Sequence, residues 1–168
     1  KPPCCESLLG KMSLLPGKAG GAMTSEVRPL RQASGTITVA TRGKGFYDAT
    51  GEIAAWLASA GAREGLLTCF IRHTSASLVI QENAYPDVLC DLTDALAGLA
   101  PENASYRHDS EGPDDMPAHI RAMVTGVSLS IPVLAGHMRL GTWQGIYVAE
   151  HRSRPHRREI ALHFLGRI

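Results

Sequence analysis

The sequence lacks the features that mark membrane, disulfide-rich and nucleic-acid-binding proteins. No apolar run approaches the roughly 18 residues that span a bilayer, which argues against a transmembrane helix. The 168 residues carry a formal net charge of only +1 and are 5% aromatic, so neither a basic field nor a stacking surface indicates nucleic acid. The four cysteines form no C-x-x-C pair and no zinc-type spacing. We therefore expect reduced thiols in a cytoplasmic protein.

Several catalytic motifs are missing as well. The chain has no G-x-x-x-x-G-K-[ST] loop, no G-x-G-x-x-G turn and no G-x-S-x-G elbow. P-loop nucleotide hydrolysis, dinucleotide binding and the usual serine hydrolase chemistry therefore have no support in the sequence.

What the chain does contain is a succession of strand-like and helix-like patterns. Alternating β-branched residues predict a strand at 34–43, and two further strands are expected within 65–83. The predicted helices span residues 48–61, 85–101 and 115–126. After residue 126 the strands follow one another without helices, which favours antiparallel pairing. We therefore expect an α+β fold, mainly antiparallel sheet or sandwich, with two to three helices.

Residues 1–22 differ in character from the rest. They combine Pro and Gly with no clear periodicity and no long apolar core, so a secretory signal is a poor match. We interpret them as a leader that is either disordered or foreign to the natural chain. The single domain is then expected over residues 23–168.

The polar segment at 104–121 holds the densest group of candidate site residues. It contains His108 and His119 on either side of a run of acids, while His73 ends an apolar strand pattern. Taken singly, each has a simpler explanation: a core-edge ring for His73, a solvated helix face for His119 and an N-cap for Asp115. Taken together, three histidines near carboxylates suit a divalent metal site with an open position. Such a metal would polarise a phosphoryl or carbonyl oxygen, or activate water.

Three aspartates, Asp87, Asp91 and Asp94, share one face of the helix predicted at 85–101. Carboxylates of this kind hold Mg²⁺ together with the oxygens of a diphosphate. The alternative is the solvated face of an amphipathic helix, which we favour for Asp87 and Asp94. For Asp91 both interpretations stay open.

A second dense stretch, GTWQGIYVAEHRSR, covers residues 141–154. Within it Glu150 shares a strand face with two apolar residues, so it lies either at the open end of the strand or in a functional buried position. A basic cluster suited to phosphate follows, formed by His151, Arg152, Arg154, His156, Arg157 and Arg158. For Arg157 and Arg158 we favour an ordinary solvated turn.

Three blocks of the sequence together resemble the YjbQ-type family, also called secondary thiamine-phosphate synthases. The blocks are HTSASLVIQENAYPDV, YRHDSEGPDDMPAHI and GTWQGIYVAEHR, and the resemblance runs from about Gly35 to Phe164. It implies a compact α+β subunit that forms a trimer, with a polar pocket near the subunit interface. The family name implies that thiazole phosphate and aminopyrimidine diphosphate are joined with release of pyrophosphate.

Carried over position by position, the resemblance also indicates a site. The expected ligands of a divalent metal, zinc or magnesium, are His73, His108 and His119. The candidate catalytic residues are Glu82, Asp115, Gln144 and Arg152, the last of these taken from the basic cluster. The candidate substrate contacts are Asn83, Thr142 and Trp143, to which the strand pattern described above adds Glu150. Many members have Asn where this chain has Met116, a side chain that offers no comparable ligand or hydrogen bond.

We therefore predict a transferase with weak, secondary thiamine-phosphate synthase activity. In this reaction the protein mainly supplies a bound cation and holds the two substrates in position. Two alternatives stay open: a non-catalytic trimeric binder of a small anionic metabolite or metal, and a metal-dependent phosphate-ester hydrolase. The expected partners are a small phosphorylated metabolite and two further copies of the chain, with no nucleic acid and no membrane.

Overall fold

Eight strands and three helices follow one another along residues 29–168, the part of the chain that the structure, a computed structural model, describes. The strands are β1 (Arg31–Thr41), β2 (Gly45–Asp48), β3 (Glu64–Ile71), β4 (Ala76–Glu82), β5 (Ser128–Leu134), β6 (His137–Met138), β7 (Gln144–Glu150) and β8 (His156–Arg167). The helices are α1 (Thr50–Ser59), α2 (Pro86–Leu99) and α3 (Asp115–Thr125). All strand pairs are antiparallel, so the predicted α+β class is confirmed.

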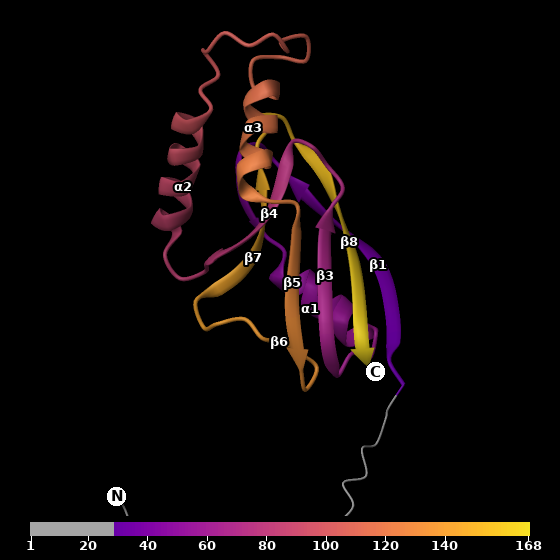
Figure 1. Cartoon of the computed structure of the whole chain (residues 1–168). Helices are drawn as coiled ribbons and strands as arrows, with labels where there is room; N and C mark the ends of the chain where they lie inside the picture. Colours follow the sequence, from indigo (N-terminus) through magenta and orange to yellow (C-terminus); the bar gives the residue numbers. More distant parts are fainter. Residues whose placement is uncertain (1–28) are drawn as a thin grey trace, which may run out of the picture.

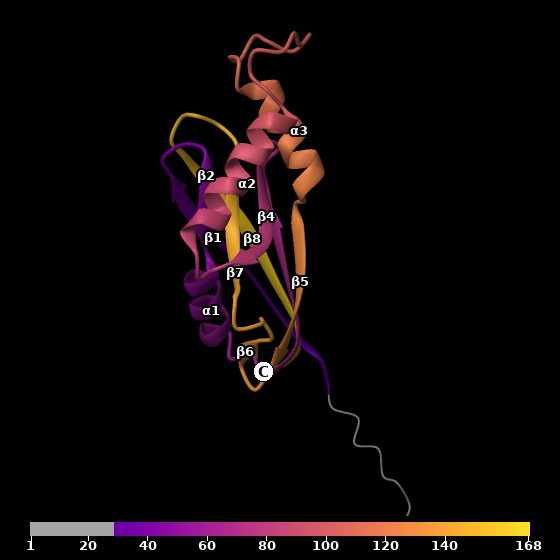
Figure 2. The same cartoon turned by 90° about the vertical axis from the view of Figure 1, so that its left-hand side faces the viewer.

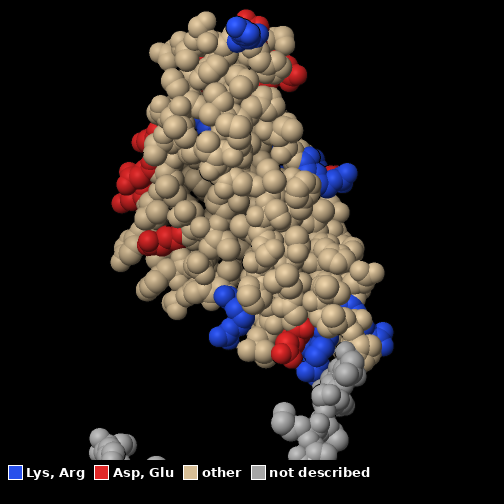
Figure 3. All heavy atoms as spheres, in the orientation of Figure 1, with Lys and Arg blue, Asp and Glu red and all other residues tan. Residues whose placement is uncertain are grey.

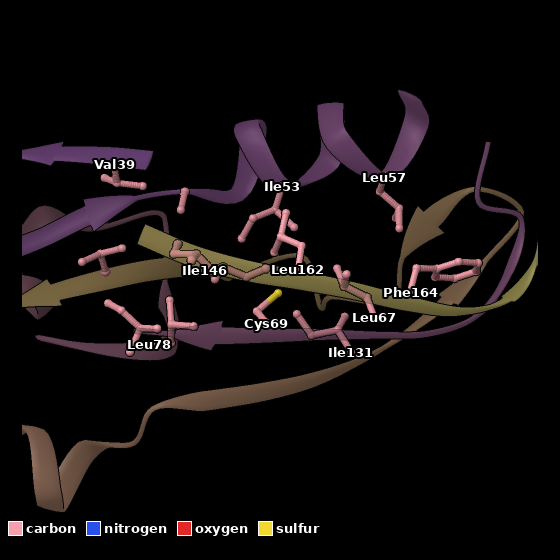
Figure 4. Close-up of a cluster of buried hydrophobic side chains, with 14 of the residues drawn as sticks. Val39, Ile53, Leu57, Leu67, Cys69, Leu78, Ile131, Ile146, Leu162 and Phe164 are labelled. Atoms are coloured by element: carbon pink, nitrogen blue, oxygen red, sulfur yellow. The ribbon is translucent and has the colours of Figure 1, made fainter. Parts of the chain in front are cut away.

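The strands form two sheets that pack face to face. The larger sheet has the order β1-β8-β3-β5-β6, and the smaller has the order β2-β7-β4. Helix α1 extends the layer of the smaller sheet, as the two views of the chain show (Figures 1 and 2). Apolar side chains from both sheets and from α1 meet between the layers, where Ile53, Leu67, Ile146 and Phe164 are fully buried (Figure 4). The alternating burial along β3 and β8 follows from strand geometry, since successive side chains point to opposite faces.

Two predicted helix ends are confirmed, and one predicted cap is wrong. Gly61 and Gly126 stand just after α1 and α3 with φ of 69° and 131°, values that a residue with a Cβ rarely adopts. Asp115 is not the N-cap of α3. The N-cap is Asp114, and neither side chain bonds the free amides of the first turn because both carboxylates are bound to other partners. The predicted leader at 1–22 lies outside the described residues.

The outer face of the larger sheet has no covering layer among residues 29–168. The apolar side chains of Leu66, Phe70 and Leu165 are each more than two-fifths exposed there. Few Lys, Arg, Asp or Glu side chains lie over the middle of this face (Figure 3). His163 also lies on this face, where its Nδ1 is 2.9 Å from the hydroxyl of Ser34. Such a patch is typical of a surface that another protein chain covers.

Helix α2 is attached through polar contacts more than through burial. None of its side chains is buried, although it lies beside α3. Arg121 of α3 donates from Nε to the carbonyl of Leu96 at 3.1 Å and from Nη2 to the carbonyl of Ala100 at 2.7 Å. These bonds satisfy carbonyl groups that the end of a helix leaves without partners. No helix in the described part of the chain is long and apolar enough to cross a membrane.

The packing of Trp56 on β1 gives a first prediction. A Cβ added to Gly35 would lie 2.1 Å from Nε1 of the Trp56 indole, so Gly35→Ala should lower the free energy of unfolding by about 1–3 kcal/mol. Urea unfolding of the variant and the parent measures this difference. Gly98→Ala is the matched control, because a Cβ there meets no atom within 4 Å and should stabilise α2 by up to about 1 kcal/mol. Equal stability of Gly35→Ala and the parent would contradict the prediction.

Candidate metal and phosphate site

Asp115, at the start of α3, is the centre of the candidate site. Its side chain is 3% exposed, and its Oδ2 lies 2.7 Å from Nε2 of His108 and 3.5 Å from Nε2 of His119. The centroids of the two imidazole rings are 5.6 Å apart. His119 comes one helical turn after Asp115 and therefore reaches the same side of the helix. His108 arrives from the loop between α2 and α3, which folds back onto the helix start.

A hydrogen bond to the backbone fixes the tautomer of His119. Its Nδ1 lies 3.1 Å from the carbonyl oxygen of Thr74, which can only accept, so Nδ1 carries the proton. In the neutral ring Nε2 is then the nitrogen with a free lone pair, and it is the nitrogen nearest Asp115. This second contact holds the ring as backbone carbonyls hold metal-binding histidines in many proteins.

The three side chains have the spacing of a metal site. One ligand atom from each of His108, Asp115 and His119 lies within 4.8 Å of the other two. Ligand atoms bound to one zinc ion at about 2.1 Å are at most about 4.2 Å apart, so a small contraction would close the cluster. His108 has a half-exposed side chain that is free to make this movement. Two imidazoles and one carboxylate leave a fourth position for water or substrate.

Arg152 holds the other oxygen of Asp115. Its Nη1 contacts Asp115 Oδ1, its Nε donates to Asp114 Oδ2 at 3.2 Å, and its Nη2 donates to the carbonyl of Glu111 at 3.0 Å. Burial raises the pKa of Asp114, but the amide of Ser153 and the charge of Arg152 outweigh this and hold it below its ordinary value. Two carboxylates thus share one guanidinium, and the surplus negative charge favours a cation beside them.

Glu150 occupies a buried position at the end of β7. It is 2% exposed, and both its oxygens accept hydrogen bonds, from Arg158, from Thr41 Oγ1 at 2.7 Å and from the amide of Arg152 at 3.0 Å. Burial raises the pKa of Glu150, but these bonds outweigh burial and hold it below the ordinary value. Glu150 is therefore fully engaged inside the protein. Arg158 is 3% exposed, so the expectation of a solvated turn is wrong for this residue.

A groove of about 800 Å³ opens beside the cluster, and His119 forms part of its wall. Arg72, His73 and Thr74 line its polar side, while Phe70 and Met123 are among the apolar residues that complete it. His73 therefore shares the groove with His119 but lies outside the three-residue cluster. Its Nε2 accepts the amide proton of Glu159 at 2.9 Å, and burial with the charge of Arg158 lowers its pKa. Its role as a metal ligand stays a prediction.

The remaining predicted site residues lie at the opposite end of the smaller sheet. Glu82 pairs with Gln144 at one end of the β4–β7 ladder, and Ala76 pairs with Glu150 at the other. Six steps along β7 correspond to about 20 Å. The residues at the far end from His119 are Glu82, Asn83, Thr142, Trp143 and Gln144. Within one subunit the structure therefore divides the predicted set into two groups.

The far group is braced by its own hydrogen bonds. Oε1 of Gln144 accepts the amide of Gly141 at 2.7 Å, and the carbonyl of Trp143 accepts the amide of Asn83 at 3.1 Å. Trp143 is nevertheless 64% exposed. The loop is thus held in a fixed shape while its largest side chain stays available for contact, as expected of an anchor at an interface.

The burial of two polar residues was not predicted from the sequence. Asp114 and His151 are each less than a tenth exposed, and Nε2 of His151 lies 2.8 Å from the hydroxyl of Ser77. His151 directly follows β7, and only the folded chain shows that this residue and Glu150 are both covered. The aspartates of α2 are all exposed, which agrees with the solvated face favoured for Asp87 and Asp94 and extends it to Asp91.

Comparison with known proteins places the chain in a family. A family model described as UPF0047 protein YjbQ-like matches residues 35–167. The chain belongs to the UPF0047 family of YjbQ-like proteins. The family resemblance drawn from the three sequence blocks is thus confirmed.

Relatives match over most of their length. A UPF0047 protein of Synechocystis sp. is 48% identical over 87% of this chain and all of its own length. The UPF0047 protein YjbQ of Salmonella typhimurium is 48% identical over 70% of this chain and 86% of its own. A crystal structure of a YjbQ/UPF0047 family protein from Clostridium acetobutylicum has a TM-score of 0.71 at 33% identity, covering 77% of this chain and 98% of that one. A YbjQ-like protein of unknown function from Sulfolobus solfataricus, 23% identical, shares the fold with a TM-score of 0.76 over 83% of this chain and all of its own.

The buried histidine of this UPF0047 protein gives a prediction of acid sensitivity. Burial and the charges of Arg121 and Arg158 lower the pKa of His151 to about 4. Because the unfolded ring titrates near 6.5, the unfolded state binds more protons between pH 6.5 and 4, and stability falls as pH drops through that window. The slope from this residue is about 1.4 kcal/mol per pH unit.

The melting temperature of His151→Gln against pH measures this contribution. The variant should show a flatter profile between pH 6.5 and 4 than the parent does. His163→Gln, on the outer face of the larger sheet, is the matched control and should keep the parent's slope. Parallel profiles for the parent and His151→Gln would contradict the assignment.

Proposed function

We propose that this UPF0047 protein acts on a small phosphorylated metabolite at a divalent metal site formed by His108, Asp115 and His119. The observation that carries the proposal is the convergence of these three ligand atoms within 4.8 Å of one another, in a cluster whose His119 also lines the groove beside His73. The reaction that we propose is the weak transfer expected of a thiamine-phosphate synthase, in which a thiazole nitrogen replaces pyrophosphate on an aminopyrimidine. A binder of a small anion or metal without turnover is the alternative that the assay must separate.

The residues fit zinc better than magnesium. Two neutral imidazoles and one carboxylate form a common zinc ligand set, whereas magnesium prefers carboxylates and phosphate oxygens. When bound, the metal would supply a Lewis acid for an oxygen of the leaving phosphate. Arg152 supports this site from behind by fixing Asp115, and Thr74 fixes the ring of His119.

Arg152 is better described as a positioning residue than as a partner of the leaving group. Each of its three nitrogens already donates one hydrogen bond, to Asp114, Asp115 or the carbonyl of Glu111, so the guanidinium is held in place by the protein itself. Arg72 is the cation that lines the groove. Its ion pair with Glu159, at 2.9 Å, joins two half-exposed side chains. Exposed ion pairs contribute little free energy, so Arg72 can leave Glu159 for a phosphate at little cost. We therefore assign phosphate neutralisation to Arg72, with the neutral ring of His73 as a hydrogen-bond donor through Nδ1.

We also propose that the working form is a homotrimer. The far group around Trp143 lies at the other end of β7, about 20 Å from Glu150, so one subunit alone does not bring the whole predicted set together. The exposed Trp143 and the apolar edge of the groove, with Phe70 and Met123, are surfaces that a second copy would cover. A ring of three copies repeats one such contact and leaves no open end.

Metal content tests the site. His108→Ala, His119→Ala and Asp115→Ala should each lower zinc affinity by about 100-fold or more, because each removes one protein ligand. Elemental analysis after zinc loading gives the stoichiometry. His73→Ala should keep most of its zinc, since its Nε2 is occupied by the backbone, and His163→Ala should keep all of it.

The same variants test the reaction. Thiamine phosphate and pyrophosphate should form from thiazole phosphate and aminopyrimidine diphosphate with the parent and His163→Ala, and not with the three ligand variants. A parent that binds zinc and both substrates without forming product would select the non-catalytic alternative. A parent that holds no zinc after loading would overturn the proposal.

Assembly gives a separate prediction. Light scattering at micromolar concentration should give three times the subunit mass for the parent. Trp143→Ala should shift this mass toward the monomer, because an exposed aromatic anchor loses its contact area. Tyr85→Ala, at another exposed aromatic residue, controls for a general effect of removing a ring. A monomeric parent would contradict the assembly.

A further inference from the structure

The groove beside the metal cluster changes from polar to apolar along its length. It lies between the end of β3 and helix α3, and two hydrogen bonds join these walls. At the polar end Nδ1 of His119 donates to the carbonyl of Thr74, and at the apolar end the amide of Ile71 donates to the carbonyl of Val127 at 2.9 Å. Three residue steps separate Ile71 from Thr74, so the two ends are at most about 11 Å apart.

The apolar end is lined by large side chains that stay exposed. Met123 is 79% exposed, Phe70 is 46% exposed and Val127 is 39% exposed. Ile71 and Ala122, which are almost fully buried, complete this end. None of these five side chains carries an N–H or O–H group, so a ligand rich in hydroxyl groups would lose water there without gaining a partner. An apolar surface of this kind beside a polar site suits the apolar part of a ligand.

Helix geometry sets the distance between the two ends of such a ligand. Met123 follows His119 by four residues, so both side chains lie on one side of α3 with Cβ atoms about 5–6 Å apart. The polar end holds the groups that we assign to the metal and the phosphate, including Arg72 and His73. A phosphorus atom at that end and a group beside Met123 are then separated by a similar distance, which a link of two carbon atoms spans.

The side chains at the apolar end favour a flat ring. Phe70 comes from β3 and Met123 comes from α3, so a ligand between the walls meets an aromatic ring on one side and a thioether on the other. Ring–ring and sulfur–ring contacts each add to the gain from burying apolar surface. The proposed trimer is compatible with this ligand, because a second copy over the same edge would enclose the ring.

We propose that the groove binds a phosphate ester whose aromatic ring is joined to the phosphate through a short link of about two carbon atoms, with the ring between Phe70 and Met123. These two residues determine specificity, because they select esters that carry a ring over sugar phosphates and inorganic phosphate. The inference rests on the proposed function for the phosphate end of the groove. It adds the residues that choose the rest of the molecule.

Binding of simple esters to the zinc-loaded parent tests the inference. Isothermal titration calorimetry should give 2-phenylethyl phosphate a dissociation constant about tenfold below that of ethyl phosphate, because the phenyl ring adds buried apolar surface. Glucose 6-phosphate should bind no more tightly than ethyl phosphate. Equal constants for the first two esters would overturn this inference and leave the phosphate site standing. Failure of every ester to bind would overturn the phosphate site and this inference with it.

A pair of neighbouring variants locates the ring. Met123→Gln removes the thioether from a side chain too exposed to support the fold, and it should reduce the preference for 2-phenylethyl phosphate by about threefold or more while ethyl phosphate binds as before. Val124→Gln is the matched control, because Val124 is 51% exposed at the next position of α3 and does not line the groove. A preference that Met123→Gln retains in full would contradict the assignment.

The methyl group of Met123 reports the position of the ring independently of affinity. In protein labelled with ¹³C at the methionine methyl groups, the Met123 resonance is the one that Met123→Gln lacks. The ring current of 2-phenylethyl phosphate should shift this resonance, whereas ethyl phosphate should not, and the methyl of Met138 in β6 should stay unchanged with both. A Met123 resonance that moves with protein concentration and not with 2-phenylethyl phosphate would mean that a second copy fills the apolar end, and would overturn the inference.

Discussion

The buried pair of Glu150 and Arg158 is the constraint on which the site depends. It joins the ends of β7 and β8, and Thr41 adds the end of β1 through a third hydrogen bond. Removing one partner of such a pair costs about 3–5 kcal/mol, because the other charge is left buried alone. The same carboxylate accepts the amide of Arg152 and so fixes the backbone from which the Arg152 side chain starts. The pair thus fixes one end of the sandwich. It also fixes Arg152, from which a series of contacts leads through Asp115 to the histidines.

That chain of contacts explains why Asp115 can be buried and still serve as a ligand. Arg152 binds one of its oxygens and compensates its charge, which leaves the other oxygen facing His108 and His119. A carboxylate that capped the helix would spend that oxygen on backbone amides. Asp115 binds side chains instead of backbone amides. This explains both why the first-turn amides of α3 have no side-chain cap and why a metal-like cluster forms there.

The sequence was sufficient for the local features and insufficient for the long-range ones. Periodicity found α1, α2 and α3, and the glycines at 61 and 126 marked two helix ends, since both signals lie within a few neighbouring residues. The pairing of His108 with His119 could be anticipated because one loop connects them. The burial of Arg158 could not, because its partner Glu150 and the covering strand β1 come from distant parts of the chain. Nor could the position of Gln144 at the opposite end of β7, about 20 Å from Glu150, since both residues belong to the same recognisable sequence block.

Helix α3 links the two charged clusters at the polar end of the molecule. Asp115 and Asp114 outnumber Arg152 at its start, while Arg121, less than two turns later, donates to carbonyls at the end of α2. Each charged group is committed by hydrogen bonds to partners on its own side, so the negative surplus beside the histidines is not offset from within the helix. The bonds of Arg121 also hold α2, where no side chain is buried, so polar contacts supply an attachment that apolar packing does not.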